Sequence, residues 1–426
     1  NPRKIFKACL QADGKIILAG REYNGSNYDF MLIRLQANGL KDNTFGSNGF
    51  VTIDKGLVDE QFTNVCVQPD GKILACGSAS EATTSYDFQI MRFNTDGSLD
   101  NTFDTDGKVA YNTAPNTESD IARDILLQPD GKIFIGGFIN SAGVYSISII
   151  RLNANGSLDN TFDTDGKVII SLANGTTNIF DMELQANGKL VVAGTEKVTV
   201  NSATGILLRF NTDGSLDNTF DTDGKAICNV SLYDNLFTAM AIQADGKIIA
   251  SGIITTASTV ENLVVRYNTN GSIDNSFNST GYRQTLVHPS KWSYVTGMKL
   301  ASDNKIVQAG YNCDPNTYTN CDAAIVRYFG DAPAALHEIQ KNTFLNIYPQ
   351  PASDYIYLQS KSDVNHVWSV SLYDYTGKVV YDFGVLPFTQ QNTIQLTWPS
   401  HVNDGLYFMK CSTETNTFME KIIIQH

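Results

Sequence analysis

The sequence has few basic residues and few histidines, which argues against nucleic-acid binding, membrane binding and histidine-based catalysis. Its 426 residues hold 31 Lys and Arg against 44 Asp and Glu, which gives a net charge of −13. Because no basic stretch can neutralise phosphates, nucleic acid and anionic membranes are poor partners. The five histidines do not repeat, and none stands in a HExxH motif or a nucleophile elbow. We therefore predict no catalytic residues, no metal site and no cofactor.

Long apolar runs and closely paired cysteines are missing as well. No run approaches the ~18 apolar residues of a membrane-spanning helix. The seven cysteines include no C-x-x-C pair, which argues against zinc. Cys313 and Cys321 bracket a polar loop between two strand-like runs. We predict a disulfide there, which suits an oxidising compartment; two free thiols in a loop are the alternative.

What the sequence does have is one phrase, Gln-Pro-Asp-Gly-Lys-Ile or a close variant, in six copies. They begin at Gln11, Gln68, Gln128, Gln185, Gln243 and Ala301. The glycine of each phrase, replaced by Asn304 in the last, follows the previous one by 57, 60, 57, 58 and 58 residues. A nearly constant period of this size indicates one supersecondary unit used repeatedly.

One copy of the unit predicts four short strands, at residues 63–68, 72–77, 87–93 and 108–111. Pro-Asp-Gly makes a tight turn between the first two, and no helical periodicity occurs. Four antiparallel strands per unit are typical of a β-propeller blade. We therefore predict an all-β chain with a propeller of about six four-stranded blades over residues 1–330; a solenoid is the alternative.

The pattern LQPDGKI…AG…DF…RxNxDGSLDxTFxxDGK resembles the bacterial delta-60 repeat over residues 1 to about 330. The resemblance implies a propeller in a secreted or surface protein, without an assigned chemistry. The sixth copy ends at its third strand. We expect its fourth strand to come from residues upstream of Asn1 or to be absent, and a complete further repeat upstream would make seven blades.

The copies differ most in the loops between the second and third strands, which share one face of the disc with the blade-to-blade connections. Loops held by a rigid scaffold commonly carry recognition. Aromatic residues that fit a protein or glycan partner recur there: Tyr23, Tyr28, Tyr86, Tyr145, Trp292, Tyr311 and Tyr318. The alternative is that these aromatics only cover the blade ends.

The Asp-rich turns of the opposite, repetitive face look superficially like calcium loops. The stretch from Asn94 to Asp106 alternates oxygen ligands before a glycine. However, it lacks the closing Glu, and the first copy carries Lys41 inside the turn. Asp and Asn also cap turns through their own backbone, which accounts for the pattern without an ion.

The last residues follow a different pattern. We predict a linker at 331–343 and a second β unit at 344–426, with the size and strand number of an immunoglobulin-like sandwich. Its motifs NIYPQPASD, LYDYTGKVV, GLY and KIII resemble the type A C-terminal sorting domain of the type IX secretion system of Bacteroidota. The motif residues are Tyr348, Pro349, Pro351, Asp354, Gly377, Lys378, Gly405, Tyr407 and Lys421. Gln350 departs from the family, which usually has Asn.

That resemblance implies an export signal that is read by an outer-membrane translocon and a shuttle protein. The expected location is the outer cell surface or the medium. We interpret the chain as secreted cargo whose propeller binds or adheres outside the cell, with a link to gliding motility as a further hypothesis. The alternative is a propeller hydrolase acting on a polysaccharide or a small ester. Clustered carboxylates in the central channel would favour the hydrolase.

Overall fold

The computed structural model describes most of the chain. The residues outside the description are 1, 57, 81–85, 113–118, 173–175, 200–201, 231–233, 316, 318, 329–344, 362–365, 375–377, 389–391, 401, 414–416 and 426. Two compact units make up the chain, Asn1–Asp331 and Ala332–His426. The predicted linker at 331–343 lies outside the described residues. Within the described part all named elements are strands, and no helix there could cross a membrane.

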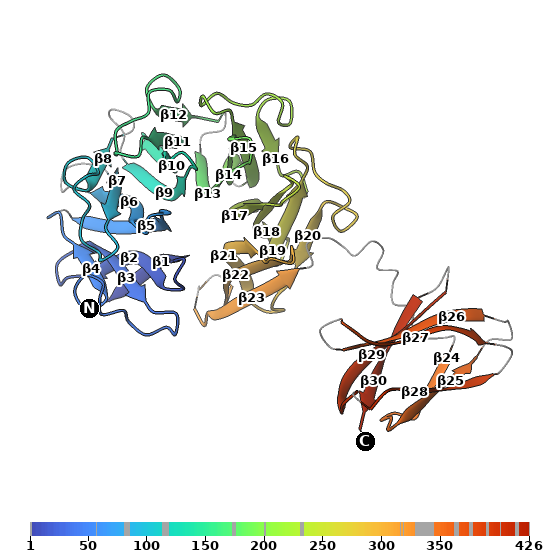
Figure 1. Ribbon diagram of the computed structural model, residues 1–426. Helices are drawn as coiled ribbons and strands as arrows, with labels where there is room; N and C mark the ends of the chain where they lie inside the picture. Colours follow the sequence, from blue (N-terminus) through green and yellow to red (C-terminus); the bar gives the residue numbers. More distant parts are fainter. Residues whose placement is uncertain are drawn as a thin grey trace. The chain divides into compact units, whose positions relative to one another are not determined.

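The first unit is a β-propeller of six blades around a centre (Figure 1). In chain order the strands of blades 1 to 3 are β1 (Arg3–Leu10), β2 (Ile16–Tyr23), β3 (Tyr28–Leu35), β4 (Phe50–Ile53), β5 (Asp59–Val67), β6 (Ile73–Ser80), β7 (Tyr86–Phe93), β8 (Lys108–Tyr111), β9 (Ser119–Leu127), β10 (Ile133–Ser141), β11 (Val144–Leu152) and β12 (Lys167–Ile170). Those of blades 4 to 6 are β13 (Thr176–Leu184), β14 (Leu190–Thr199), β15 (Ser202–Phe210), β16 (Lys225–Ile227), β17 (Asn235–Ile242), β18 (Ile248–Thr255), β19 (Val260–Tyr267), β20 (Tyr282–Thr285), β21 (Trp292–Leu300), β22 (Ile306–Cys313) and β23 (Asp322–Tyr328). The all-β propeller prediction is confirmed.

Each blade is an antiparallel meander whose inner turn is the repeated phrase. In blade 2 the backbone N–H of Gln68 donates to the carbonyl of Lys72 at 2.8 Å, and Gly71 donates back to Gln68 at 2.9 Å. Gly71 has φ +84°, which a side chain disfavours, and the carboxylate of Asp70 accepts the N–H of Lys72. The phrase therefore encodes the hairpin itself.

A bulge in the inner strand explains a second repeated glycine. The register between β5 and β6 shifts between Phe62 and Asn64. Opposite this shift, a Cβ on Gly77 would lie 1.9 Å from the carbonyl oxygen of Gln61, so no larger residue fits. The equivalent glycine in the other blades has the same close approach: Gly20, Gly137, Gly194, Gly252 and Gly310.

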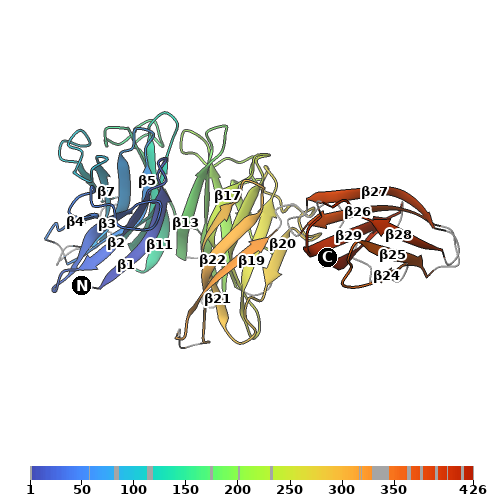
Figure 2. The ribbon, with the colours of Figure 1, turned by 60° about the horizontal axis from the view of Figure 1, so that its bottom comes forward.

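The hydrophobic cores lie between neighbouring blades. The cluster between blades 1 and 2 joins Phe30 and Leu32 to Phe62 and Met91, all fully buried. Phe30 and Phe62 have ring centroids 4.6 Å apart. Removing a buried Phe of this kind costs about 3–5 kcal/mol, so blade-to-blade packing is a main source of stability. Figure 2 shows the strands running between two faces that carry the loops.

Blade 6 is shorter than the others. It consists of β21, β22 and β23, and the described residues give it no fourth strand. The ribbon is open between β21 and β1 (Figure 1). The expectation that the fourth strand comes from upstream of Asn1 or is absent stays a prediction.

The second unit is a sandwich of a three-stranded and a four-stranded antiparallel sheet. Its strands are β24 (Leu345–Tyr348), β25 (Tyr355–Ser360), β26 (His366–Asp374), β27 (Val379–Phe388), β28 (Thr393–Thr397), β29 (Gly405–Ser412) and β30 (Thr417–Ile424). Trp368, Leu358 and Met409 are fully buried at its core. The two sheets have the orders β24-β25-β28 and β27-β26-β29-β30.

Candidate functional site

On the repetitive face, each of the first five blades carries a cluster of opposite charges that we call the blade clasp. In blade 3, Asp159 accepts Arg151 Nε at 2.6 Å and Lys132 Nζ at 2.9 Å through Oδ2. Its Oδ1 accepts the hydroxyl of Thr161 at 2.7 Å. Desolvation opposes ionisation here, but the hydrogen bonds from Thr161 and Lys132, with the charge of Arg151, hold the pKa of Asp159 well below its usual range.

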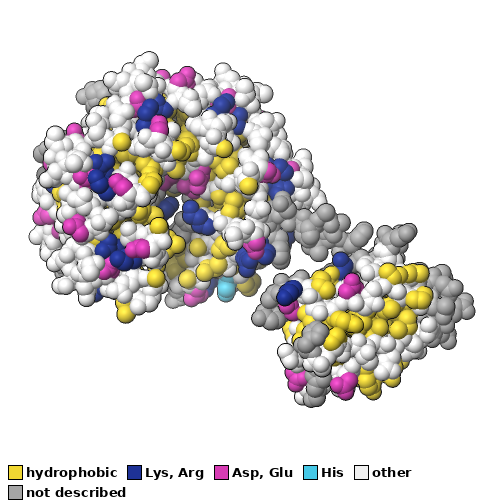
Figure 3. All heavy atoms as spheres, in the orientation of Figure 1, with side chains coloured by type: hydrophobic (Ala, Val, Ile, Leu, Met, Phe, Trp, Pro, Cys, Tyr) yellow, Lys and Arg dark blue, Asp and Glu magenta, His cyan; other side chains and the backbone are white. Residues whose placement is uncertain are grey.

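The clasp has the same geometry in all five blades. The Arg Nε to Asp Oδ2 distances lie between 2.6 and 2.7 Å. Its Arg, Asp and Lys members are Arg34, Asp42 and Lys15; Arg92, Asp100 and Lys72; Arg151, Asp159 and Lys132; Arg209, Asp217 and Lys189; and Arg266, Asp274 and Lys247. Acidic and basic side chains accordingly recur together around the ring in Figure 3. These aspartates have cationic protein partners at the turns that resemble calcium loops.

The clasps of blades 1 to 4 also tie each of these blades to the next. Arg151 Nη1 donates to the carbonyl of Thr212 in blade 4 at 2.6 Å. The guanidinium lies over the ring of Phe162, 4.8 Å from its centroid. Phe162 in turn lies against Gly214 of blade 4, where an added Cβ would come within 3.2 Å of the ring. The R-x7-D-x-[TS]-F spacing recurs regularly in the sequence, but we did not predict the role of its arginine from that spacing.

A second charged cluster lies at the centre of the ring, and it does not repeat. It brings Asp124 of blade 3 and Asp181 and Glu183 of blade 4 toward Lys7 of blade 1 and Lys299 of blade 6. Burial raises the pKa of Asp124 to about 8 and that of Glu183 to about 7, with the charge of Asp181 adding to both shifts. Burial also raises the pKa of Asp181.

Two of these carboxyl groups join neighbouring blades. Asp124 accepts the N–H of Met182 in blade 4 at 2.7 Å, and Asp181 accepts the N–H of Met240 in blade 5 at 2.6 Å. Asn64 of blade 2 donates its amide to Asp124. Asp124 is buried and Glu183 half-buried, while Lys7 is open to the solvent. Lys7 keeps its charge because the attraction of Asp124 and Asp181 outweighs its desolvation and raises its pKa.

A third acidic group lies near the divergent face, where Asp29, Asp54 and Glu60 bring carboxylate oxygens within 4.8 Å of one another. Glu60 accepts the backbone N–H of Lys55 at 2.9 Å, and Asp29 accepts the amide of Asn24 at 2.9 Å. These groups have protein donors, and nothing further at the cluster points to an ion.

The aromatic residues predicted for the divergent face lie on several blades and form separate pairs. Tyr23 and Tyr28 have ring centroids 5.2 Å apart, and Arg21 lies 4.0 Å from the Tyr28 centroid. Tyr311 stacks on Tyr294 at 5.2 Å and is 37% exposed.

The other described aromatic residues of that set have partners or burial within their own blades. Tyr145 lies 5.4 Å from the ring of Phe138, and the Tyr86 hydroxyl is 3.4 Å from a carboxylate oxygen of Asp59. Trp292 is partly buried, and Tyr318 lies outside the described residues. The structure thus distributes this set around the ring and does not gather it into one pocket.

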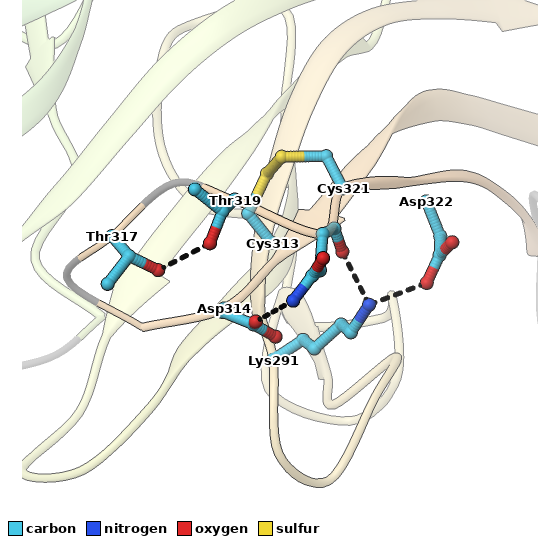
Figure 4. The surroundings of a disulfide bond; sticks show 8 residues. Lys291, Cys313, Asp314, Thr317, Thr319, Cys321 and Asp322 are labelled. Carbon is cyan, nitrogen blue, oxygen red and sulfur yellow. Dashed lines mark hydrogen bonds and ion pairs between the residues drawn. A yellow bond between two sulfur atoms is a disulfide. The ribbon is translucent and has the colours of Figure 1, made fainter.

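The loop between β22 and β23 is held by the disulfide Cys313–Cys321 (Figure 4). Asn320 donates its amide to Asp314 at 2.7 Å inside the loop. Lys291, which directly precedes β21, binds Asp322 at 2.6 Å, so a side chain from outside the loop also holds its end at β23.

In the sandwich, the structure joins two sorting motifs that are distant in sequence. Gln350 donates its amide to the carbonyl of Lys421 at 2.9 Å and accepts the N–H of Ile423 at 3.2 Å. Ala352 adds a backbone hydrogen bond to Ile423 at 2.8 Å. Pro349 and Pro351 therefore lie beside the final strand β30, between β24 and β25. They lie there because residues 345–348 form a strand of their own.

The remaining motif residues lie along the same unit. Tyr407 of β29 donates its hydroxyl to the carbonyl of Asn403 at 2.9 Å, and Gly405 begins that strand. Lys378 is exposed, and its N–H donates to Asp374. Asp354 lines a surface hollow with Trp398, Ser400, Val402, Asn403 and Asp404. Tyr348 is 41% exposed, and Gly377 lies outside the described residues.

Comparison with known families agrees with both units. Residues 346–425 match the secretion system C-terminal sorting domain. This chain carries a type IX sorting domain. Five segments of the propeller, residues 11–45, 68–103, 128–162, 185–220 and 243–277, match the β-propeller domain of unknown function DUF5122. Because the sorting domain directs export, the protein is delivered by the type IX secretion system to the cell surface or the extracellular space.

No curated protein matches the chain in sequence. Among solved structures it is similar to PorZ, described as an essential bacterial surface component of the type-IX secretion system of Porphyromonas gingivalis, at 11% identity and a TM-score of 0.40. That match covers 99% of this chain, which spans 59% of the PorZ chain. Sqt1 from Chaetomium thermophilum matches at 10% identity, a TM-score of 0.40 and coverages of 91% and 87%. A PL25 ulvan lyase matches at 10% identity and a TM-score of 0.40, and the match covers 91% of this chain and 92% of the lyase chain. TM-scores at this level carry no argument about activity.

Proposed function

We propose that the propeller is an extracellular binding or adhesion module that the sorting domain delivers to the cell surface. The observation that carries the proposal is the difference between the two faces. On the repetitive face, charged residues pair with one another in the clasps between blades. On the opposite face, the ring holds loops whose sequences differ from blade to blade. The aromatic pairs Tyr23–Tyr28 and Tyr294–Tyr311 on that face offer contact area of the kind that protein and glycan partners use.

The experiment is a glycan array and a surface-protein binding assay with the full chain. Tyr311→Ala should weaken the binding of any ligand found by at least about tenfold, as truncation at a contact centre does. Tyr348→Ala is the matched control, because Tyr348 is similarly exposed but belongs to the sorting domain. Equal losses in both variants, or a ligand indifferent to Tyr311, would contradict the assignment of this face.

We further propose that the translocon and its shuttle read the corner where Gln350 holds the Pro349–Pro351 segment against β30. The support is that two separate sorting motifs meet there through the hydrogen bonds to Lys421 and Ile423. Deleting residues 342–426 should leave the propeller inside the cell, as measured by fractionation. Normal secretion of the truncated chain would exclude the sorting role.

A second candidate function is hydrolysis at the central channel, and the cluster there is the observation that favours it. A carboxyl group with a pKa near 7, such as that of Glu183, can donate a proton at neutral pH, as a general acid must. Against this, Asp124 and Asp181 are engaged in hydrogen bonds between blades. A screen of polysaccharides and small esters with the protein and its Glu183→Gln variant distinguishes the two functions.

A further inference from the structure

One edge of blade 1 is uncovered, although the same edge of the following blades is covered. None of the eight residues of β1 is buried, whereas five of the nine residues of β5 and five of the eight of β17 are. Ile5, Phe6 and Leu10 are 40%, 37% and 69% exposed. With three exposed large hydrophobic residues, this inner propeller strand has no covering neighbour on that side among the described residues.

The glycine of the turn that follows the third strand in blades 1 to 5 shows what the missing neighbour supplies. A Cβ added to Gly97, Gly156, Gly214 or Gly271 would lie between 2.9 and 3.2 Å from the clasp phenylalanine of the preceding blade. The equivalent residue of blade 1 is Gly39, and nothing lies within 4 Å of the same position. The backbone conformation is nearly the same, with φ +83° at Gly39 against +91° at Gly97, although Gln36 stands where the other four turns have Asn.

Two backbone carbonyls of the same turn repeat this difference. In blade 3, the carbonyl of Ala154 accepts a hydrogen bond from the clasp arginine of blade 2, and the carbonyl of Asn155 accepts one from a backbone N–H of blade 2. In blade 4, the carbonyls of Thr212 and Asp213 accept the same two bonds from blade 3. Ala37 and Asn38 are the equivalents in blade 1. Within the described residues, neither carbonyl accepts a hydrogen bond from another blade.

Neither blade 6 nor a second copy of the ring can cover this edge in the same way. In the sequence after Arg327, Ala335, His337 and Glu338 stand where the clasp has Asp, Thr and Phe. Arg327 itself pairs with Asp303 of its own blade. The clasp phenylalanines of blades 1 to 5 are at most 4% exposed, because the ring already uses them: Phe45, Phe103, Phe162, Phe220 and Phe277.

We propose that the edge formed by β1 and residues 36–39 is a docking surface for one more repeat unit of the same type, supplied from outside residues 1–426. The unit carries the R-x7-D-x-[TS]-F spacing. Its phenylalanine covers Gly39, and its arginine donates to the carbonyl of Ala37. One of its backbone N–H groups donates to the carbonyl of Asn38. The proposal follows from continuity with the four junctions that already have this chemistry, and it is independent of what the divergent face binds.

The test adds such a unit to the full chain. A second copy of residues 59–118, which is blade 2 with its connection to blade 3, is placed before Arg3. A protease site at the new joint allows the copy to be cut free. We expect amide hydrogen exchange in β1 to slow by at least ~10-fold, the thermal midpoint to rise by about 2 °C or more, and the cut copy to remain bound in gel filtration.

Phe103→Ala confined to the added copy should abolish all three effects, because the natural blade 2 is unchanged. Gly39→Ala should lower the midpoint more in the extended chain than in the parent chain, since the new Cβ meets the docked phenylalanine only there. Gly143→Ala is the matched control, with φ +82° and open space around it, and should have the same effect in both chains. Unchanged exchange in β1, an extended chain no more stable than the parent, or indifference to Phe103→Ala would overturn the proposal.

Discussion

The blade clasps and the charged cluster at the centre of the ring, which we call the channel cluster (Lys7, Asp124, Asp181, Glu183 and Lys299), both join blades through charged groups, but they do so with opposite chemistry. The clasp pairs a buried carboxylate with Arg and Lys, and the partners of Asp274 lower its pKa to about 2 despite desolvation. In the channel, burial dominates and raises the pKa of Asp124 to about 8. Repetition explains the difference, because the clasp is encoded in each of five copies, whereas the channel depends on residues that only single copies carry.

The two regions therefore respond to pH with opposite sign. A lowered carboxyl pKa stabilises the fold above the unfolded value near 4, and that contribution is lost as the pH falls toward the folded value. For Asp274 the loss falls between about pH 4 and pH 2. A raised carboxyl pKa works the other way. The contribution of Asp124 is complete below about pH 4 and is lost as the pH rises toward 8.

The largest expected effect comes from breaking a clasp. Arg151→Ala leaves Asp159 buried beside a single lysine and removes the hydrogen bond to Thr212, so we expect a loss of about 3–5 kcal/mol in the free energy of unfolding. Denaturant titration of the propeller measures it. Arg327→Ala is the control, because the Arg327–Asp303 pair is exposed and should cost at most about 1 kcal/mol. Equal costs would mean that the clasp does not join the blades.

Replacing a channel carboxyl should have a smaller effect with a distinct pH signature. Asp124→Asn removes the ionisable group but keeps its size, and it loses one of the acceptors used by Met182 and Asn64, at a cost of about 1–3 kcal/mol. The titratable groups that interact with Asp124 are Lys7, Asp181, Cys66 and Cys76.

The diagnostic measurement for Asp124→Asn is the pH dependence of unfolding. The native chain should lose stability between about pH 4 and pH 8, and this slope should be reduced in the variant. A variant with an unchanged slope would show that Asp124 does not carry the proton. Glu183→Gln is a useful comparison, because the pKa of Glu183 is raised to about 7 but its side chain is only half-buried.

Features that repeat in every blade could be predicted from the sequence, whereas the charged cluster at the centre of the ring could not. The hairpins, the third strand and the fourth strand of blade 2 were predictable, because Gly71 and the alternating apolar residues act locally. The channel was not, because Lys7, Asp124 and Asp181 meet only after bulges in three inner strands place them at the centre of a ring. The clasp stands between these cases: its spacing is local, but its partner carbonyl belongs to the next blade.

The smallest effect is expected in the sorting domain, where uncharged Gln350 joins two segments by hydrogen bonds and no ion pair is involved. Gln350 bridges β30 by donating to Lys421 and accepting from Ile423, and both hydrogen bonds are exposed to solvent. We expect Gln350→Ala to cost about 0.5–1.5 kcal/mol and to leave the propeller unaffected. Hydrogen exchange at the Ile423 amide is the direct measurement, because the variant removes its acceptor. Gln350→Asn, one methylene shorter, should keep one of the two bonds and give an intermediate rate. An unchanged rate at Ile423 in both variants would show that the backbone bonds of Ala352 alone hold the segment on β30.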